Sequence, residues 1–300
     1  MYSYTLNHLV QFSKLNEQMI VLWNKKYKIF NDEKIDKSSL FTQDDLKKLI
    51  IVSFLANSNV RYTVEKLCAQ SISELSIVTE FELQNFLKKN KIFSPLINLL
   101  VCSCFTYDAK SFDSILSICF KQLGIEECCV KIVFPVISQL AILIDTNSVH
   151  SAIKSFTKNL IRKQLHFLIK STPYSVDNNR TWLLFLPENE FHDIELLYAH
   201  LLLKLDGEKS IYLGDNQTKE SINECLNTIN ITHVFTYIND DYDKDKMKDY
   251  LSTIKKIYPT STIFVATYNK LKEPITEEIP YINVNNPIMF KEYLDKIIAM

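Results

Sequence analysis

Apolar residues recur at helical spacing in four short stretches near the start of the chain. The first two predicted helices span residues 6–12 and 16–27, and a turn at 13–15 separates them. Further helices are expected over 42–56 and from near residue 63. Two short helices that are joined by a tight turn predict a helix-turn-helix.

Helical spacing continues through residues 76–175. Pro95 and Pro135 each suit the first turn of a helix, because the N–H that proline lacks has no helical partner there. Residues 155–170 form a last amphipathic helix. Four or five helices of this length predict a helical bundle.

Short apolar strands alternate with helices in the remainder of the chain. The expected strands span residues 181–186, 210–213, 233–237, 262–266 and 281–284. The expected helices span residues 194–204, 218–227, 243–256 and 287–299. This alternation predicts a parallel, doubly wound sheet, which binds ligands beyond the carboxyl ends of its strands. Residues 187–193 lie at such an end.

These patterns divide the chain into three predicted domains: a head over 1–75, a helical bundle over 76–175 and an α/β domain over 180–300. The polar stretch 171–179 marks the last boundary, and the polar stretch 28–41 is wing-like. The predicted fold class is α plus α/β and multidomain. It combines a winged helix-turn-helix head, a helical bundle and a flavodoxin-like (Rossmann-like) parallel-sheet domain.

Composition excludes several classes of protein. Three glycines are too few for the glycine-rich loops that hold phosphates in dinucleotide-binding and P-loop proteins. The seven cysteines lack the spacing of zinc ligands, so we expect small buried thiols in a reduced, cytoplasmic protein. No apolar run reaches the roughly eighteen residues of a membrane span. No catalytic spacing of Ser, His, Cys and Asp is evident, so we expect no enzyme.

Charge favours nucleic acid only in the head. The whole chain has a net charge of −1, whereas residues 1–75 contain ten Lys or Arg and eight Asp or Glu. The candidate DNA-binding residues are Lys14, Asn16, Gln18, Lys25, Lys26, Tyr27, Lys28, Arg61 and Tyr62. Lysine holds phosphates, and Asn or Gln can read adenine. An ordinary solvated lysine face would have the same composition.

Three segments of the head carry a family resemblance: residues 4–9, 20–27 and 41–49. Together with the domain order, they resemble MerR-family transcriptional regulators that carry a cobalamin-binding domain. The resemblance covers nearly the whole chain and implies a DNA-binding winged helix-turn-helix. That family usually has an arginine where Val21 stands, a glutamate where Asn24 stands, and Arg-Tyr-Tyr near Ser39. Some of the usual DNA contacts are therefore replaced.

Residues 190–195 are similar to the Glu/Asp-x-His-x-x-Gly motif of cobalamin-binding domains. The resemblance makes His192 the residue that can approach cobalt from below, and the next strand ends in Gly214. Glu195 stands where the motif has glycine. Ala266-Thr267 replaces the later glycine pair that admits the nucleotide tail of the corrin.

Light-sensing members of this family cap the corrin with a tryptophan and a Glu-His pair. The matching positions here are Ile144, Lys154 and Ser155. Side chains at Glu195 and Thr267 fill space that glycine leaves open. We therefore expect neither bound cobalamin nor a bound metal ion.

Three classes of function follow. The first is a transcriptional regulator that binds double-stranded DNA and forms homo-oligomers, with no membrane partner, and whose C-terminal domains serve sensing or oligomerisation. The second is a regulator that acts by protein contact without DNA, which the changes at Val21 and Ser39 favour. The third uses cobalamin through His192, either as a sensor or as a corrinoid enzyme module.

Overall fold

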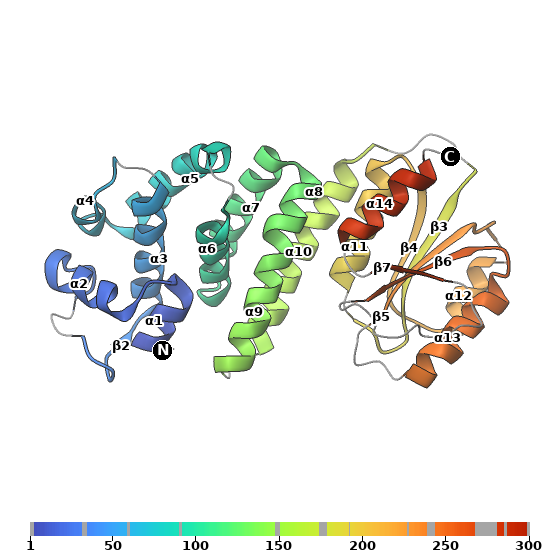
Figure 1. Ribbon diagram of the computed structural model, residues 1–300, viewed down its shortest axis with the longest axis horizontal. Helices are drawn as coiled ribbons and strands as arrows, with labels where there is room; N and C mark the ends of the chain where they lie inside the picture. The colour runs from blue at the N-terminus through green and yellow to red at the C-terminus, as the bar shows by residue number, and fades with distance from the viewer. Residues whose placement is uncertain are drawn as a thin grey trace. The chain divides into compact units, whose positions relative to one another are not determined.

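The computed structural model divides the chain into two compact units, unit 1 (Met1–Leu160) and unit 2 (Ile161–Met300) (Figure 1). The structure describes residues 3–31, 35–58, 61–89, 92–147, 151–173, 179–191, 193–226, 228–238, 244–267, 281–284 and 287–298. Within these residues, unit 1 is built mainly of helices and unit 2 on a five-stranded sheet.

Unit 1 begins with two short helices, α1 (Leu6–Ser13) and α2 (Glu17–Tyr27). The side chain of Thr5 accepts a hydrogen bond from the backbone N–H of His8, and Nδ1 of His8 accepts one from the backbone N–H of Thr5. This reciprocal cap satisfies donors that a helix start leaves open. Helix α1 ends because Lys14 adopts a left-handed backbone conformation with φ 57°. The predicted helix pair is therefore present.

A short ribbon accompanies the helix pair. β1 (Tyr4–Thr5) pairs antiparallel with β2 (Leu40–Phe41). The hydroxyl of Tyr4 donates to the backbone oxygen of Phe105, 3.2 Å away. The rings of Phe12 and Phe105 lie 4.4 Å apart between centroids. Both contacts attach the helix pair to the helices that follow it.

The remaining helical segments of unit 1, and the helix that leads into unit 2, are α3 (Gln43–Ser58), α4 (Val64–Cys68), α5 (Ile72–Lys89), α6 (Ser94–Phe105), α7 (Ala109–Leu123), α8 (Ile125–Cys128), the π-helical turn η1 (Cys129–Val133), α9 (Phe134–Asn147) and α10 (Ser151–Ser171). Helix α6 is buried from Leu96 to its end, so it forms the centre of unit 1. The predicted helical bundle is confirmed. All seven cysteines are free and six are buried, as expected of small apolar thiols.

Segments α8, η1 and α9 form one continuous helix. Its residues Ile125–Ile144, 20 in number with a mean hydropathy of 1.9, are long and apolar enough to cross a membrane. Within unit 1 this helix packs against α6 and α7, where Cys128, Ile132 and Leu140 are buried. An apolar helix in the core of a bundle has the same length and composition.

Unit 2 contains a sheet of five parallel strands in the order β4-β3-β5-β6-β7. The strands are β3 (Thr181–Pro187), β4 (Lys209–Gln217), β5 (His233–Ile238), β6 (Thr262–Thr267) and β7 (Ile282–Val284). The helices are α11 (Asp193–Leu205), α12 (Lys219–Leu226), α13 (Lys244–Ile257) and α14 (Pro287–Ile298). The predicted parallel, doubly wound sheet is confirmed. Strand β4 is longer than predicted, because two register shifts let it follow β3 to its end.

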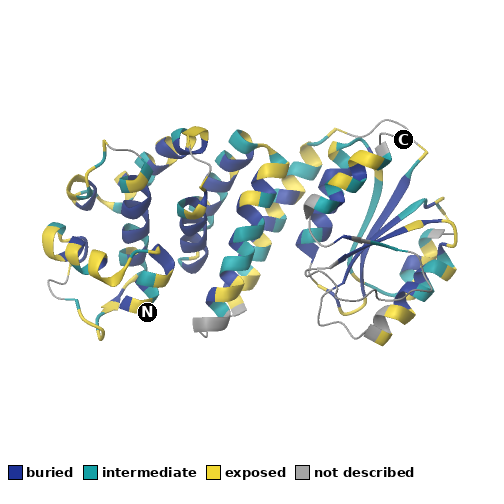
Figure 2. Cartoon of the chain, in the orientation of Figure 1, coloured by how far each residue is buried: buried dark blue, intermediate teal, exposed yellow. Residues whose placement is uncertain are grey.

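Alternate residues of β3 pack on opposite faces of the sheet. Leu183 joins a buried cluster that includes Leu251 of α13. Trp182 faces the other side, where its ring lies 5.1 Å from that of Phe264 and 6.0 Å from that of Phe290 in α14. Helices α12 and α13 therefore cover one face, and α11 and α14 cover the other (Figure 1). Buried residues run along the strands between these two layers (Figure 2).

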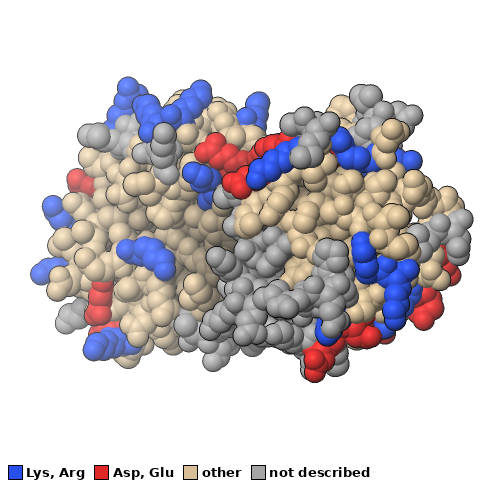
Figure 3. Space-filling model, turned by 45° about the vertical axis from the view of Figure 1, so that its right-hand side comes forward, with Lys and Arg blue, Asp and Glu red and all other residues tan. Residues whose placement is uncertain are grey.

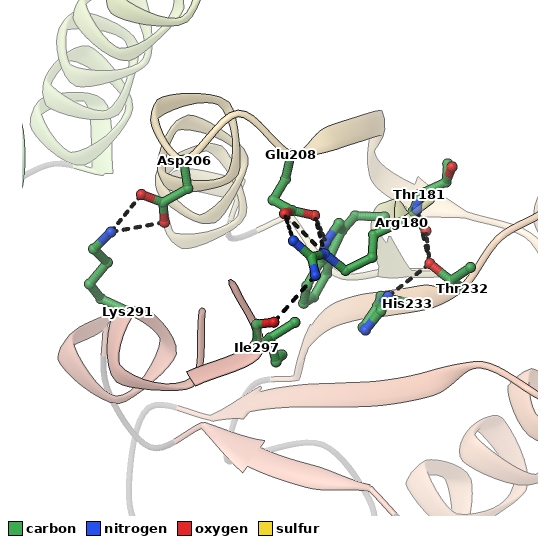
Figure 4. Close-up of polar contacts among 9 residues, drawn as sticks. Arg180, Thr181, Asp206, Glu208, Thr232, His233, Lys291 and Ile297 are labelled. Atoms are coloured by element: carbon green, nitrogen blue, oxygen red, sulfur yellow. Dashed lines mark hydrogen bonds and ion pairs between the residues drawn. The ribbon is translucent and has the colours of Figure 1, made fainter. Parts of the chain in front are cut away.

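A buried ion pair between Arg180 and Glu208 joins the amino ends of β3 and β4 (Figure 4). The carboxylate of Glu208, whose side chain is 1% exposed, accepts hydrogen bonds from Nε of Arg180 at 3.1 Å and Nη2 at 2.7 Å. It also accepts one from Nε1 of Trp182 at 3.0 Å. Arg180 donates in turn to the backbone oxygen of Ile297, 3.3 Å away. These bonds compensate the cost of burying the Glu208 charge.

Candidate functional site

Helix α2 presents a broad face to solvent. Its exposed residues are Glu17, Gln18, Met19, Leu22, Lys25 and Lys26. Gln18, Leu22 and Lys25 follow one another at spacings of four and three, so their side chains share one side of the helix. Leu22 is 51% exposed and adds an apolar side chain to this side of the helix. Ile20 and Trp23 face inward and hold α2 against the rest of unit 1.

Side-chain hydrogen bonds set the turn that precedes α2. Oγ of Ser13 donates to the backbone oxygen of Leu9 at 2.6 Å and accepts from the backbone N–H of Leu15 at 3.2 Å. Oδ1 of Asn16 accepts from the backbone N–H of Met19 at 2.7 Å. Asn16, a predicted DNA contact, thus caps α2 and orients it.

Three of the predicted lysines lie at the end of α2. Lys25 and Lys26 are exposed in its last turn, and the exposed Lys28 ends it with φ 52°. The ammonium of Lys26 lies 5.1 Å from the ring centroid of the half-buried Tyr27, a cation–π contact. On the face drawn in Figure 3, Lys and Arg are dispersed among uncharged residues rather than gathered in one patch. Any basic surface here is therefore local.

Arg61 and Tyr62, the last two predicted DNA contacts, precede α4. Arg61 is exposed. The hydroxyl of Tyr62 donates to Oε1 of Glu82 at 3.0 Å, and Glu82 is buried in α5. Burial, and then the Glu82 carboxylate, raise the pKa of Tyr62. Glu82 was not among the sequence candidates, because a single acid on a helix gives no signal of burial.

The loop after β3 is joined to the last residues of β4 by hydrogen bonds. The backbone N–H of Asn189 donates to Oδ1 of Asn216 at 2.8 Å, and the backbone N–H of Asn216 donates to the oxygen of Glu190 at 3.1 Å. Both asparagines have left-handed backbones, with φ 69° and 53°. His192, the candidate cobalt ligand, lies outside the described residues.

The first residue of α11, Asp193, is buried beside this edge. Its Oδ2 accepts a hydrogen bond from Nε of Arg162 at 2.8 Å. That bond is the main cause that raises the pKa of Arg162. Asp193 directly follows His192 in the sequence, and its partner in the structure is an arginine of α10.

Burial also shifts the pKa values of His200 in α11 and Tyr212 in β4. Burial lowers the pKa of His200 from its usual 6.5 to about 4, and its Nδ1 lies 3.1 Å from Oγ of Ser210. Burial, and then the charges of Asp193 and Asp215, raise the pKa of Tyr212. His200 is therefore neutral near pH 7.

Gly214, the second cofactor candidate, adopts φ +90°, a conformation that favours glycine. A Cβ atom built there would meet only the Tyr212 ring, at an ordinary contact distance of 3.6 Å. The register shift of β4 at Gly214 therefore favours glycine for its backbone conformation and not for lack of space. Within the described residues, no cluster of His, Cys, Asp and Glu could hold a metal ion.

Several residues of unit 2 bear on the expected corrin site. Phe185 and Ile238, near the carboxyl ends of β3 and β5, are buried in the core that the sheet forms with α12 and α13. Glu195 is half-buried on α11, where the motif has glycine. Thr267 ends β6 beside Ile238.

The bundle positions do not supply the expected cap groups either. In unit 1, Ile144 is half-buried on α9, and Lys154 and Ser155 are exposed on α10. A tryptophan and an imidazole would have to be provided by other residues.

No family model matches the sequence, and no curated protein matches it. Solved structures do match. A monomethylamine corrinoid protein from Methanosarcina barkeri is 12% identical with a TM-score of 0.54, and the match covers 68% of this chain and 99% of that chain. Unit 2 holds less than half of the residues, so the match extends into the preceding helices. At this identity the likeness shows a shared fold, a helical bundle followed by a parallel sheet.

Two further structures align with lower scores. A cobalamin-binding protein from Desulfitobacterium hafniense DCB-2 is 11% identical with a TM-score of 0.35, covering 67% of this chain and 97% of that chain. The methanol:cobalamin methyltransferase complex MtaBC from Methanosarcina barkeri is 12% identical with a TM-score of 0.35, covering 73% and 84%.

Proposed function

We propose that the chain is a DNA-binding transcriptional regulator of the MerR type. Helices α1 and α2, the ribbon β1–β2 and helix α3 then form a winged helix-turn-helix. The observation that carries the proposal is the exposed side of α2, which a short turn and two capped helix starts hold in place. In such heads the second helix enters the major groove.

The exposed side of α2 has the chemistry of a groove-reading helix. The amide of Gln18 can pair with adenine, and the apolar side chain of Leu22 can contact the methyl group of thymine. Lys25 follows on the same side and can hold a phosphate. In this proposal the exposed side chain of Leu22 packs against the thymine methyl group, a contact that unit 1 itself does not provide.

Lysines rather than arginines supply the charge. Lys25, Lys26 and Lys28 gather at the end of α2, and Lys14 lies in the turn before it. Ammonium groups attract phosphates as point charges and do not make the bidentate contacts of arginine. We therefore expect moderate, strongly salt-dependent affinity.

In this proposal unit 2 serves sensing or oligomerisation without bound cobalamin. Its fold is that of a corrinoid protein, which supports descent from a corrin-binding domain. In the described part of its carboxyl edge, hydrogen bonds join Asn189 and Glu190 to Asn216. Paired half-sites in DNA would require at least a dimer, so homo-oligomers are part of the proposal.

The test is a gel-shift titration of the full chain against the DNA upstream of its own gene, with random duplex as competitor. The variant replaces Lys25, Lys26 and Lys28 with alanine. Loss of three phosphate contacts lowers the slope of log affinity against log salt by about three. The control replaces Lys121, Lys209 and Lys256, which are exposed outside the head. It removes the same charge and should leave that slope unchanged.

Two outcomes would contradict the proposal: equal affinity for upstream and random duplex, or an equal loss in both triple variants. The second would mean that only net charge matters.

A regulator that acts by protein contact is the alternative. Val21 and Ser39 are half-buried and carry no charge, which favours this view. It predicts that the triple variant at the end of α2 keeps full regulatory function in cells while remaining folded.

The fold shared with a corrinoid protein favours a third candidate, a cobalamin-dependent sensor that uses His192. It predicts a corrin absorption band in the purified protein after incubation with cobalamin.

A further inference from the structure

A cavity of about 170 Å³ lies in unit 1 beside the turn between α1 and α2. Its walls come from the turn, from the middle of α3 and from the start of α6. Lining residues are Ser13, Lys14, Leu15, Ile50, Ser53, Phe54, Asn57, Ser94, Pro95 and Asn98. A cavity of about 150 Å³ can hold benzene, so this one has room for a small organic molecule.

Two deeply buried polar side chains face this cavity with unused hydrogen-bonding groups. Ser53 is 9% exposed, and its hydroxyl has no hydrogen-bond partner among the described residues. Asn98 is 7% exposed; its Oδ1 accepts from Nε2 of Gln139 at 3.1 Å, which leaves its amide N–H groups to the cavity. Solvent reaches both groups through the opening of the cavity, and a bound molecule would replace that water with its own acceptor.

The other polar groups in the wall favour a negative charge. Lys14 supplies an ammonium group, and the lining contains no carboxylate. Helix α6 begins here at Ser94, and its N-cap residue Phe93 makes no side-chain cap bond. The open N–H groups of such a helix start add positive potential.

The rest of the wall is apolar. Leu15, Ile50, Phe54 and Pro95 contribute hydrocarbon surface beside these donors. We propose that the cavity binds a small carboxylic acid with an apolar body about the size of a benzene ring. The carboxylate accepts hydrogen bonds from Lys14, Ser53 and Asn98, and the body lies against the apolar wall.

Such a ligand would touch the turn of the helix pair and the first turn of α6 at once. It would fix the position of α1 and α2 relative to the bundle helices of unit 1. Only this regulatory consequence rests on the proposed DNA-binding function. Binding itself is measured without DNA, so the two ideas can fail separately.

The experiment titrates the full chain with benzoate by calorimetry, with acetate and benzyl alcohol as matched probes. Acetate keeps the charge and lacks the ring, whereas benzyl alcohol keeps the ring and lacks the charge. We expect saturable benzoate binding at least about tenfold tighter than that of either probe, because a charge-assisted hydrogen bond contributes about that factor.

Lys14→Gln should weaken benzoate binding about tenfold, whereas Lys25→Gln, at an exposed lysine outside the cavity, should leave it unchanged. Ser53→Met, which fills the cavity, should abolish it. The proposal is overturned by absence of saturable benzoate binding, by equal affinity for benzoate and benzyl alcohol, or by equal effects of Lys14→Gln and Lys25→Gln. Lys14 is exposed, so its variant tests the site even where Ser53→Met does not fold.

Discussion

Two surfaces that the family resemblance marks as functional differ in how they use their side chains. Helix α2 in unit 1 leaves Gln18, Leu22 and Lys25 exposed on one side. The carboxyl edge of the sheet in unit 2 instead joins its own loops through Asn189 and Asn216, 2.8 Å apart from N to Oδ1. The first surface is exposed to solvent, and the described part of the second is joined by hydrogen bonds between its own segments.

This difference shows that a domain can share a fold with a ligand-binding protein while its residues at the ligand site differ. Unit 2 shares the parallel sheet of a corrinoid protein, while Glu195 stands where the corrin motif has glycine. The sheet is held by contacts at the opposite edge, around Glu208. A domain whose stability does not depend on a ligand can lose the ligand and keep its fold.

The largest expected effect is at that opposite edge. Glu208→Ala leaves Arg180 and the indole N–H of Trp182 without their buried acceptor. Breaking a buried ion pair at one side costs about 3–5 kcal/mol of unfolding free energy. Chemical unfolding, followed by the fluorescence of Trp182 in a Trp23→Phe background, measures unit 2 alone, because the chain has two tryptophans.

Glu188→Ala is the matched control, since Glu188 is an exposed acid of the same unit. It should change stability by less than about 0.5 kcal/mol. A similar small loss for Glu208→Ala would mean that the amino edge does not hold the sheet, and the comparison of the two edges would fail.

The next effect concerns the open surface of α2. Gln18→Ala should reduce the preference for the cognate site over a site changed at one A·T pair by about 1–3 kcal/mol. Affinity for random duplex should stay the same, because the change removes no charge. Gln11→Ala, at an exposed glutamine of α1, is the control. Gel shifts with both duplexes measure it, and an unchanged preference would exclude base reading by Gln18.

The elements themselves were predictable where local chemistry defines their ends. Asn16 caps α2, and Thr42 precedes α3 and accepts a hydrogen bond from the backbone N–H of Asp45. The ribbon β1–β2 was not predicted, because strands of two residues show no alternation. Strand β4 was predicted too short, since its extension depends on register shifts against β3.

The contacts of the candidate residues could not be predicted from the sequence. Gln18 and Lys25 were expected on the predicted second helix, and the structure exposes both there. The bond from Tyr62 to Glu82 and the bond from Arg162 to Asp193 join different elements. Such pairs depend on tertiary packing, which one sequence does not encode in any local pattern.

A smaller effect should appear in the pH dependence of unit 2. Burial lowers the pKa of His200 to about 4, whereas the unfolded imidazole titrates near 6.5. The unfolded state therefore binds the proton first as pH falls. The contribution of neutral His200 to stability is complete above pH 6.5 and declines from there to about pH 4.

His200→Gln should flatten that decline, measured by Trp182 fluorescence at a series of pH values. His166→Gln, at an exposed histidine whose charge is the smallest of the causes that lower the pKa of His200, should change the decline only slightly. Equal slopes for the His200 variant and the unchanged chain would show that other groups control the acid sensitivity of unit 2.

The smallest expected effect is that of cobalamin, for which we expect no change at all. The purified protein should be colourless, should not retain adenosyl- or methylcobalamin after desalting, and should not change its assembly in light. Glu195 occupies the glycine position of the motif, and Thr267 replaces the second glycine of the later pair. Binding would gain one coordination bond from His192. That bond would have to offset the free-energy cost of rearranging close-packed side chains to make space for the corrin. The visible spectrum after incubation decides the matter. A stoichiometric corrin band that disappears in His192→Ala would show that the carboxyl edge opens on binding, and that the closed edge and the open α2 surface are not alternatives but two working sites of one sensor.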